Sequence, residues 1–193
     1  DEYKVMPDVE QVNAKHDIKL KSAKDLDPNH FNWLLDEFET FSRHKALEHA
    51  IQSDPKESCG LLIVKKGKET YFPCQNLASE PTDQFILSPE DWIEAEDQGE
   101  VIGVVHSHPV TSPNPSEADK VACEKSNLKW WIIQPNLKQW GYCEPCGYKA
   151  PLIGRQWVWG VTDCWSLCRD WYKEELGIEL IDWIRPNSSD EFI

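Results

Sequence analysis

The chain of 193 residues is 40% apolar and carries a formal net charge of −14. It is long enough to bury one sizeable core, and its acidity repels the phosphate backbone of nucleic acid, which is therefore excluded as an expected partner. No apolar run approaches the ~20 residues that a membrane-spanning helix needs, so no membrane span is expected.

The first 38 residues are charged and lack the long apolar periods of core elements. We interpret residues 1–38 as an N-terminal extension that is partly irregular. Its stretch DLDPNHFNWLL combines turn residues with a short apolar patch. This patch predicts that the extension docks through four side chains: Phe31, Trp33, Leu34 and Leu35.

Residues 39–142 are predicted to form one α/β unit, because short apolar runs alternate with segments of helical pattern. KKGKE, with its central glycine, separates two such runs and indicates a hairpin. Ser88, followed by Pro89 and Asp91, has the pattern of a helix N-terminus with a capping box. The expected elements are a helix over 37–52, strands over 60–64 and 70–74, a helix over 88–98, a strand over 101–105, a helix over 115–126, and strands over 128–135 and 138–145.

Residues 143–193 begin with a stretch rich in glycine, proline and tryptophan. We interpret this stretch as a linker wrapped on a surface. A helix then begins after Thr162 or Asp163 as N-cap and ends at Gly177, a favoured C-terminal cap. Five side chains are expected to share one face of this helix: Cys164, Leu167, Cys168, Trp171 and Tyr172.

The stretch VIGVVHSHPVTSPNPSEAD, residues 101–119, places two histidines at the end of an apolar strand. Because residues i and i+2 of a strand point to the same side, His106 and His108 are expected to aim together. Asp119 lies one turn into the next predicted helix, so its carboxylate is expected to point back at the strand end. Two imidazoles and a carboxylate can give zinc three ligands and leave a fourth position for water. The more ordinary interpretation is that Ser116 and Asp119 form a capping box and that His-Ser-His is a turn.

This constellation, His-x-His followed by Ser and Asp at the spacing found here, resembles the JAMM (MPN-plus) metallopeptidase family over residues 39–142. The resemblance implies an α/β fold with a curved, mostly antiparallel sheet flanked by helices. It implies that His106, His108 and Asp119 bind zinc, although iron, nickel or cobalt would also suit these ligands. Glu57, in PKESCGLLIV, takes the place of the family's upstream glutamate and would be the general base. Ser116 would hydrogen-bond near the oxyanion or position the water.

The seven cysteines are odd in number and spread along the chain, which does not fit a disulfide scaffold. Four of them approach the spacing of a four-cysteine site for zinc or an iron–sulfur cluster: Cys143, Cys146, Cys164 and Cys168. Apart from that hypothesis, small buried apolar positions are expected for Cys59, Cys74, Cys123 and Cys168.

The stretch GYKAPLIGRQWVWGVTDCWSLCRDWY resembles the opening of an NlpC-type cysteine peptidase domain, which is papain-like. Residues 143–193 would then be a linker and the incomplete N-terminal part of such a domain. In that group the nucleophilic cysteine opens a helix, and Cys164 takes this position, where helix amides favour a thiolate. The activating histidine of the group comes later in the chain, and no histidine follows His108 here. We therefore predict no cysteine peptidase activity from this chain by itself.

The order of the two units resembles the tail-tip assembly protein K family of lambda-like phages over residues 39–193. The marker phrases are KESCGLLIV, VVHSHP, PSEAD, CGYKAPLIGR and GVTDCWSLCRDWY. The resemblance implies a hydrolase of amide or isopeptide bonds at the virion tail tip, or in the host cytoplasm during assembly. Its substrate would be peptidoglycan peptides or a tail protein, and its partners other tail-tip proteins. Two alternatives stay open: a structural tail-tip assembly protein with a vestigial or structural metal site, and a cellular deubiquitinase-like role.

Overall fold

The computed structural model describes residues 42–183 and 185–186. The predicted extension over 1–38 and its docking side chains lie outside the described residues. A helix covers 42–53, and the elements that follow lie close to their predicted places. They are β1 Cys59–Lys65, β2 Lys68–Cys74, α3 Pro89–Gln98, β3 Glu100–Ser107, α4 Glu117–Ser126, β4 Lys129–Gln134, β5 Gln139–Cys143 and α5 Cys164–Leu176.

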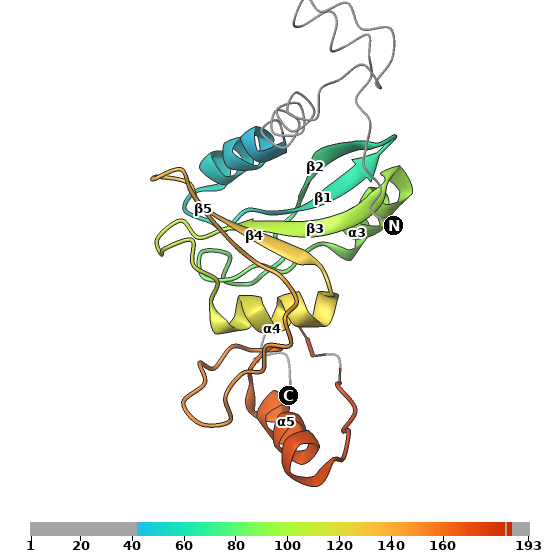
Figure 1. Ribbon diagram of the computed structural model, residues 1–193. Helices are drawn as coiled ribbons and strands as arrows, with labels where there is room; N and C mark the ends of the chain where they lie inside the picture. Colours follow the sequence, from blue (N-terminus) through green and yellow to red (C-terminus); the bar gives the residue numbers. More distant parts are fainter. Residues whose placement is uncertain (1–41, 184, 187–193) are drawn as a thin grey trace, which may run out of the picture.

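The centre of the fold is a five-stranded sheet in the order β2-β1-β3-β4-β5, with helices on both faces (Figure 1). Three strand pairs are antiparallel, and β3 and β4 are parallel because α4 crosses over between them. The expected α/β class with a mostly antiparallel sheet flanked by helices is confirmed. None of the helices in this part of the chain has both the length and the apolar content that a bilayer crossing requires.

The start of α3 differs in one detail from its prediction. Ser88 caps the helix, since its Oγ accepts a hydrogen bond from the Asp91 N–H at 3.1 Å, and Pro89 opens it. The Asp91 carboxylate does not close the predicted capping box. It accepts instead from the Gln75 N–H, 2.6 Å away. The box is therefore half formed, because the second bond ties α3 to the end of β2.

Alternate residues of the strands divide the core between the two faces of the sheet. On one face the strands pack against the helix over 42–53 through Ala46 and Ala50. On the other face they pack against Ala95 of α3 and Cys123 of α4. Val104 belongs to this second face. Residues two and four positions further along β3 and its extension therefore project toward α4 as well.

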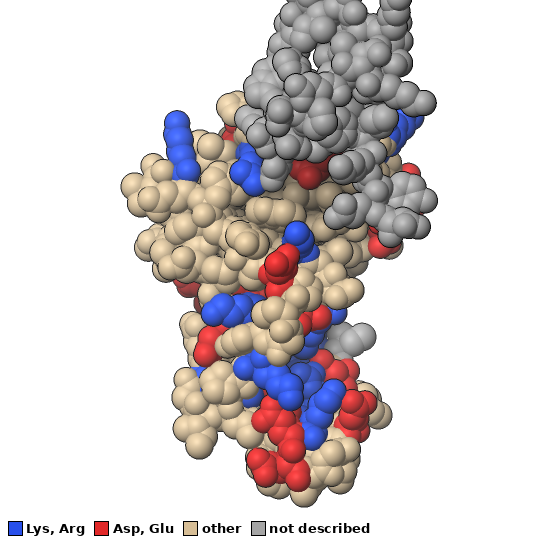
Figure 2. Space-filling model, viewed as in Figure 1, with Lys and Arg blue, Asp and Glu red and all other residues tan. Residues whose placement is uncertain are grey.

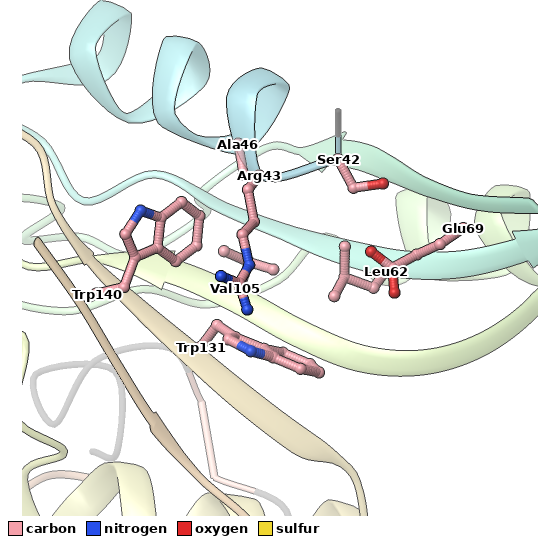
Figure 3. Close-up of a pocket in the computed structure, with 8 residues that line it drawn as sticks. All are labelled: Ser42, Arg43, Ala46, Leu62, Glu69, Val105, Trp131 and Trp140. Carbon is pink, nitrogen blue, oxygen red and sulfur yellow. The ribbon is translucent and has the colours of Figure 1, made fainter. Parts of the chain in front are cut away.

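A small cavity lies beside the helix over 42–53, between Arg43, Trp131 and Trp140 (Figure 3). The Arg43 guanidinium carbon lies 5.8 Å from the centroid of the Trp140 ring. The cavity encloses about 10 Å³, which is at the lower limit for one water molecule. Packing therefore leaves no room for a substrate at this cavity.

Charged groups link the C-terminal region to α4 and also pair within that region. Lysine, arginine, aspartate and glutamate side chains gather over α4 and α5, in the lower half of Figure 2. Asp182 pairs with Lys125 of α4 at 3.2 Å and with Arg169 of α5 at 2.5 Å. Arg155 pairs with Asp170 at 2.9 Å. Four of the five side chains expected to share a face of α5 are exposed: Cys164, Cys168, Trp171 and Tyr172.

The cysteines differ in burial. Cys59, Cys74 and Cys123 are buried, as expected for small apolar residues. Cys168 is exposed, so its expected burial is wrong. The physical reason is that α5 makes ion pairs through Arg169 and Asp170, while no other part of the described chain covers the side of the helix that carries Cys168.

Asp163 holds the start of α5. Its carboxylate accepts hydrogen bonds from the Ser166 N–H and Oγ, at 2.8 and 2.7 Å, and pairs with Arg185. Burial alone would raise the pKa of Asp163. The Ser166 donors, Arg185 and the Gly160 N–H outweigh burial, so the pKa lies below its ordinary value.

Asp163→Ala is expected to destabilise the C-terminal region by about 2 kcal/mol or more at pH 7, through loss of the helix cap and an orphaned Arg185. Amide hydrogen exchange over α5 measures this. The pKa of Asp163 is lower in the folded chain than in the unfolded chain, where it is ~3.9. The ionised carboxylate therefore gives its full stabilisation of the C-terminal region at pH values above ~3.9. This stabilisation is lost as the pH falls through the folded value, so the difference from wild type should vanish there. The Glu174→Ala control removes an exposed carboxylate and should change protection by less than about 1 kcal/mol.

Candidate metal centre

Three side chains converge at the carboxyl end of β3: His106, His108 and Asp119. The Nε2 atoms of the two histidines are 3.1 Å apart. Asp119 Oδ1 lies 3.2 Å from His106 Nε2, and Asp119 Oδ2 lies 3.4 Å from His108 Nε2. One nitrogen or oxygen atom of each residue lies within 4.8 Å of those of the others, and all three residues are buried. The strand periodicity and the start of α4 together produce this convergence.

Asp119 performs both of the roles that the sequence leaves as alternatives. Ser116 Oγ accepts from the Asp119 N–H at 3.1 Å, and the Ser116 N–H donates to Asp119 Oδ2 at 2.7 Å. This capping box fixes the carboxylate while Oδ1 faces His106. Burial alone would raise the pKa of Asp119, but His106, His108 and the Ser116 N–H hold it well below its ordinary value. The carboxylate is therefore ionised, as a metal ligand must be.

The imidazoles present the atoms that a cation needs. His108 Nδ1 lies 2.9 Å from the Ser112 carbonyl oxygen. When Nδ1–H donates a hydrogen bond to this oxygen, Nε2 carries the lone pair of the neutral ring, and this lone pair faces the cluster. The His106 ring stacks on Phe85 at 4.6 Å and meets the edge of Trp130 at 5.6 Å, between ring centroids. Burial lowers the pKa of His106 and so favours the neutral ring.

The donor set fits a catalytic zinc site. It consists of two imidazole nitrogens and one carboxylate oxygen, and no fourth histidine, cysteine or acidic ligand joins them among the residues that the structure describes. Three protein ligands with a remaining open position are typical of catalytic zinc, whereas structural zinc has four. His106 Nδ1 is buried and has no hydrogen-bond partner within the described ranges.

Glu57 lies beside the histidines in continuation of the pairing between β1 and β3. The Ser107 N–H donates to the Ser58 carbonyl oxygen at 3.0 Å, so Glu57 and His108 are next in register. Glu57 is only 9% exposed and lines the same cleft as His108. Burial raises the pKa of Glu57 to about 8, although His108 acts in the opposite direction. Such a group can both accept and release a proton near neutral pH.

A cleft of about 700 Å³ opens at the cluster. Three segments supply most of its lining: 82–86, 108–119 and 156–161. Ser116 belongs to this lining, but its Oγ accepts the capping bond from α4. Its predicted role at the oxyanion or the water therefore stays a prediction.

The four cysteines with metal-site spacing are not brought together. In the described part of the chain, the histidine–aspartate cluster is the one group of three or more candidate ligands. Cys164 is the exposed first residue of α5 and does not line the cleft. The four-cysteine hypothesis is therefore not supported, and the role of Cys164 as a nucleophile stays a prediction.

Two parts of the cleft are not predictable from local sequence patterns. Phe85 and Trp130 enclose the His106 ring, yet they lie far apart in the chain and follow no motif spacing. The segment over 156–161 is interpreted from its sequence as part of a surface linker, but it lines the cleft. Its two tryptophans within four residues, WVWG, are the one available signal.

Comparison with known proteins matches this region to a family. The model described as prokaryotic homologs of the JAB domain (Prok-JAB) matches residues 42–142. The tail tip assembly protein K of Escherichia phage N15 is 42% identical over 137 residues, which cover 71% of this chain and 56% of the relative. Tail tip assembly protein K of Escherichia phage lambda is 43% identical over 101 residues, covering 52% and 48%. The chain thus spans about half the length of these curated relatives.

A further relative is the desampylase of Haloferax volcanii. It is 30% identical over 99 residues, which cover 47% of this chain and 71% of the relative. The match to the family model extends over more than half of the chain and includes Glu57 and the entire histidine–aspartate cluster. The chain belongs to the family of prokaryotic JAB-domain homologs.

Proposed function

We propose that the chain is a zinc-dependent hydrolase of amide bonds, acting as a peptidase or isopeptidase. The observation that carries this proposal is the convergence of His106, His108 and Asp119 beside a cleft that His108, Asp119 and Glu57 line. Membership of the JAB family and similarity to a protein named desampylase support hydrolysis.

The residues of this chain divide the chemistry between them. His106, His108 and Asp119 would hold zinc, which supplies a Lewis acid for the substrate carbonyl and lowers the pKa of water toward neutrality. Glu57 accepts the proton of the attacking water and then donates it to the leaving amine, a task that its raised pKa suits. The Ser116 hydroxyl donates a hydrogen bond near the developing oxyanion or orients the water.

We place this activity at the tail tip of a phage virion, or in the host cytoplasm during assembly. Similarity to the tail tip assembly proteins K of phages N15 and lambda supports this placement. The substrate is then a peptidoglycan peptide or a tail protein, and the partners are other tail-tip proteins. A structural assembly role without hydrolysis is the second candidate. It is favoured by the exposed apolar side chains of the C-terminal region, such as Trp183 at 62% exposure.

Removal of the metal is expected to abolish hydrolysis, and added zinc is expected to restore it, because the side chains alone do not acidify water. The measurement is amine release from peptide-linked and lysine isopeptide-linked amides, peptidoglycan fragments and tail proteins. Full activity after metal removal, with the loss verified by elemental analysis, would contradict the zinc mechanism. If the zinc-loaded chain hydrolysed none of these substrates, the structural assembly role would be favoured.

A further inference from the structure

The cleft at the metal centre is bounded by a segment outside the residues that the family model matches. This segment, called the cleft wall below, comprises residues 156–161. Five of its six residues line the cleft: Gln156, Val158, Trp159, Gly160 and Val161. The family match ends at residue 142. The JAB domain and the C-terminal region therefore share one cleft.

The cleft wall is a bonded turn rather than a loose linker. The Thr162 N–H donates to the Val158 carbonyl oxygen at 2.9 Å, and Thr162 Oγ1 donates to the Gln156 carbonyl oxygen at 2.7 Å. The Trp159 indole N–H donates to the Pro186 carbonyl oxygen at 2.8 Å. These bonds hold the turn in one conformation, and the buried cap of α5 follows it directly.

Helix α4 connects the cleft wall with the metal centre. Asp119 of this helix faces the histidines, while Glu117 accepts a hydrogen bond from the Gln156 N–H at 2.9 Å. Further along the same helix, Lys125 pairs with Asp182 of the C-terminal region. One helix thus positions both a candidate ligand and the cleft wall.

The lining of the cleft favours apolar over acidic substrate groups. Val158 and Trp159 of the wall, together with Phe85, offer apolar surface, and no lysine or arginine of the described chain lines the cleft. Away from the candidate metal centre, a substrate carboxylate would find no lysine or arginine to pair with and would share the cleft with Asp83. An apolar side chain would instead lose its hydration against aromatic surface.

We infer that the cleft wall is a specificity-determining part of the substrate site, with Trp159 as its main contact. It selects a peptide that carries an apolar rather than an acidic side chain beside the scissile bond. A cleft of about 700 Å³ accommodates a short peptide segment but not a folded domain. The inference rests on the proposed function, because it assigns a substrate class to the same site.

The test measures binding to the zinc-loaded Glu57→Gln chain, so that no turnover is needed. The probes are the peptides acetyl-Ala-Ala-Phe-Ala-Ala-amide and acetyl-Ala-Ala-Glu-Ala-Ala-amide, and the observable is the indole N–H resonances. Trp159→Phe and Trp171→Phe variants assign the two signals. Trp171 is the matched control, because it lies on α5, is 44% exposed and does not line the cleft. The Phe peptide should shift the Trp159 signal and leave that of Trp171 nearly unchanged, and the Glu peptide should bind about tenfold more weakly or worse.

In hydrolysis, Trp159→Ala should raise KM about tenfold while kcat stays within about twofold, and Trp171→Ala should change neither. Equal shifts of both indoles, equal affinity for both peptides, or no shift at millimolar peptide would overturn the inference. Peptide binding at Trp159 without hydrolysis by the wild-type chain would uphold the inference and contradict the proposed function alone.

Discussion

Elemental analysis of the purified chain is expected to give one equivalent of zinc, and the His106→Ala plus Asp119→Ala variant is expected to give none. The wild-type cluster offers three ligand atoms within 4.8 Å of one another, in a buried site. The double variant keeps only the His108 imidazole. Loss of a single residue that hydrogen-bonds to a metal ligand already lowers metal affinity by about 10–100-fold. Loss of two of the ligands themselves should therefore leave no zinc bound during purification.

Asp119 also caps α4, so its removal has a structural effect that must be separated from loss of the metal. Asp119→Asn keeps an acceptor oxygen for the Ser116 N–H and serves as the second variant. Cys143→Ser plus Cys146→Ser is the matched control and should retain the zinc. Zinc or iron that stays in the histidine–aspartate variant but disappears in the cysteine variant would place the metal at the cysteines. A full equivalent of iron, nickel or cobalt in the wild-type chain would keep the site and change the assigned metal.

The convergence of His106, His108 and Asp119 was predictable because its geometry depends on local rules. The apolar run VIGVV specifies β3, and the strand period then places His106 and His108 on one side. The capping box of α4 orients Asp119 through contacts with Ser116, three residues away. The sequence presents the cap and the ligand as competing interpretations. The structure shows that one carboxylate makes both sets of contacts.

The surroundings of the site depend on contacts between distant segments, and no local period describes them. Phe85 reaches His106 because of how the segment before α3 folds over β3. The cleft wall reaches the cleft because α4 and the C-terminal region are joined by polar bonds, such as that of Glu117 with Gln156. The exposure of Cys168 on α5 was not predicted, for a related reason. A helical period identifies an apolar face, but not whether another element covers it.

Glu57→Gln is expected to retain one equivalent of zinc and to lose hydrolysis by about 10²–10⁴-fold. Glutamine has nearly the shape of glutamate, so it preserves the position that lies in register with His108. It cannot accept the proton of the attacking water or deliver a proton to the leaving amine. The measurement is kcat/KM on the substrate that the zinc-loaded wild-type chain hydrolyses best, with metal content determined in parallel.

Cys164→Ala is the matched comparison, since this thiol is exposed and lies outside the cleft. We expect its kcat/KM to equal that of the wild type, because no histidine follows His108 to activate the thiol. Rapid and selective labelling of Cys164 by a thiol-reactive probe would argue against an idle thiol. If Glu57→Gln hydrolysed the substrate at the wild-type rate while Cys164→Ala did not, the catalytic residue would be the cysteine. If Glu57→Gln lost hydrolysis but kept its zinc, and Cys164→Ala stayed active, metal binding would be intact in the inactive variant. The step that this variant lacks would then be proton transfer by Glu57.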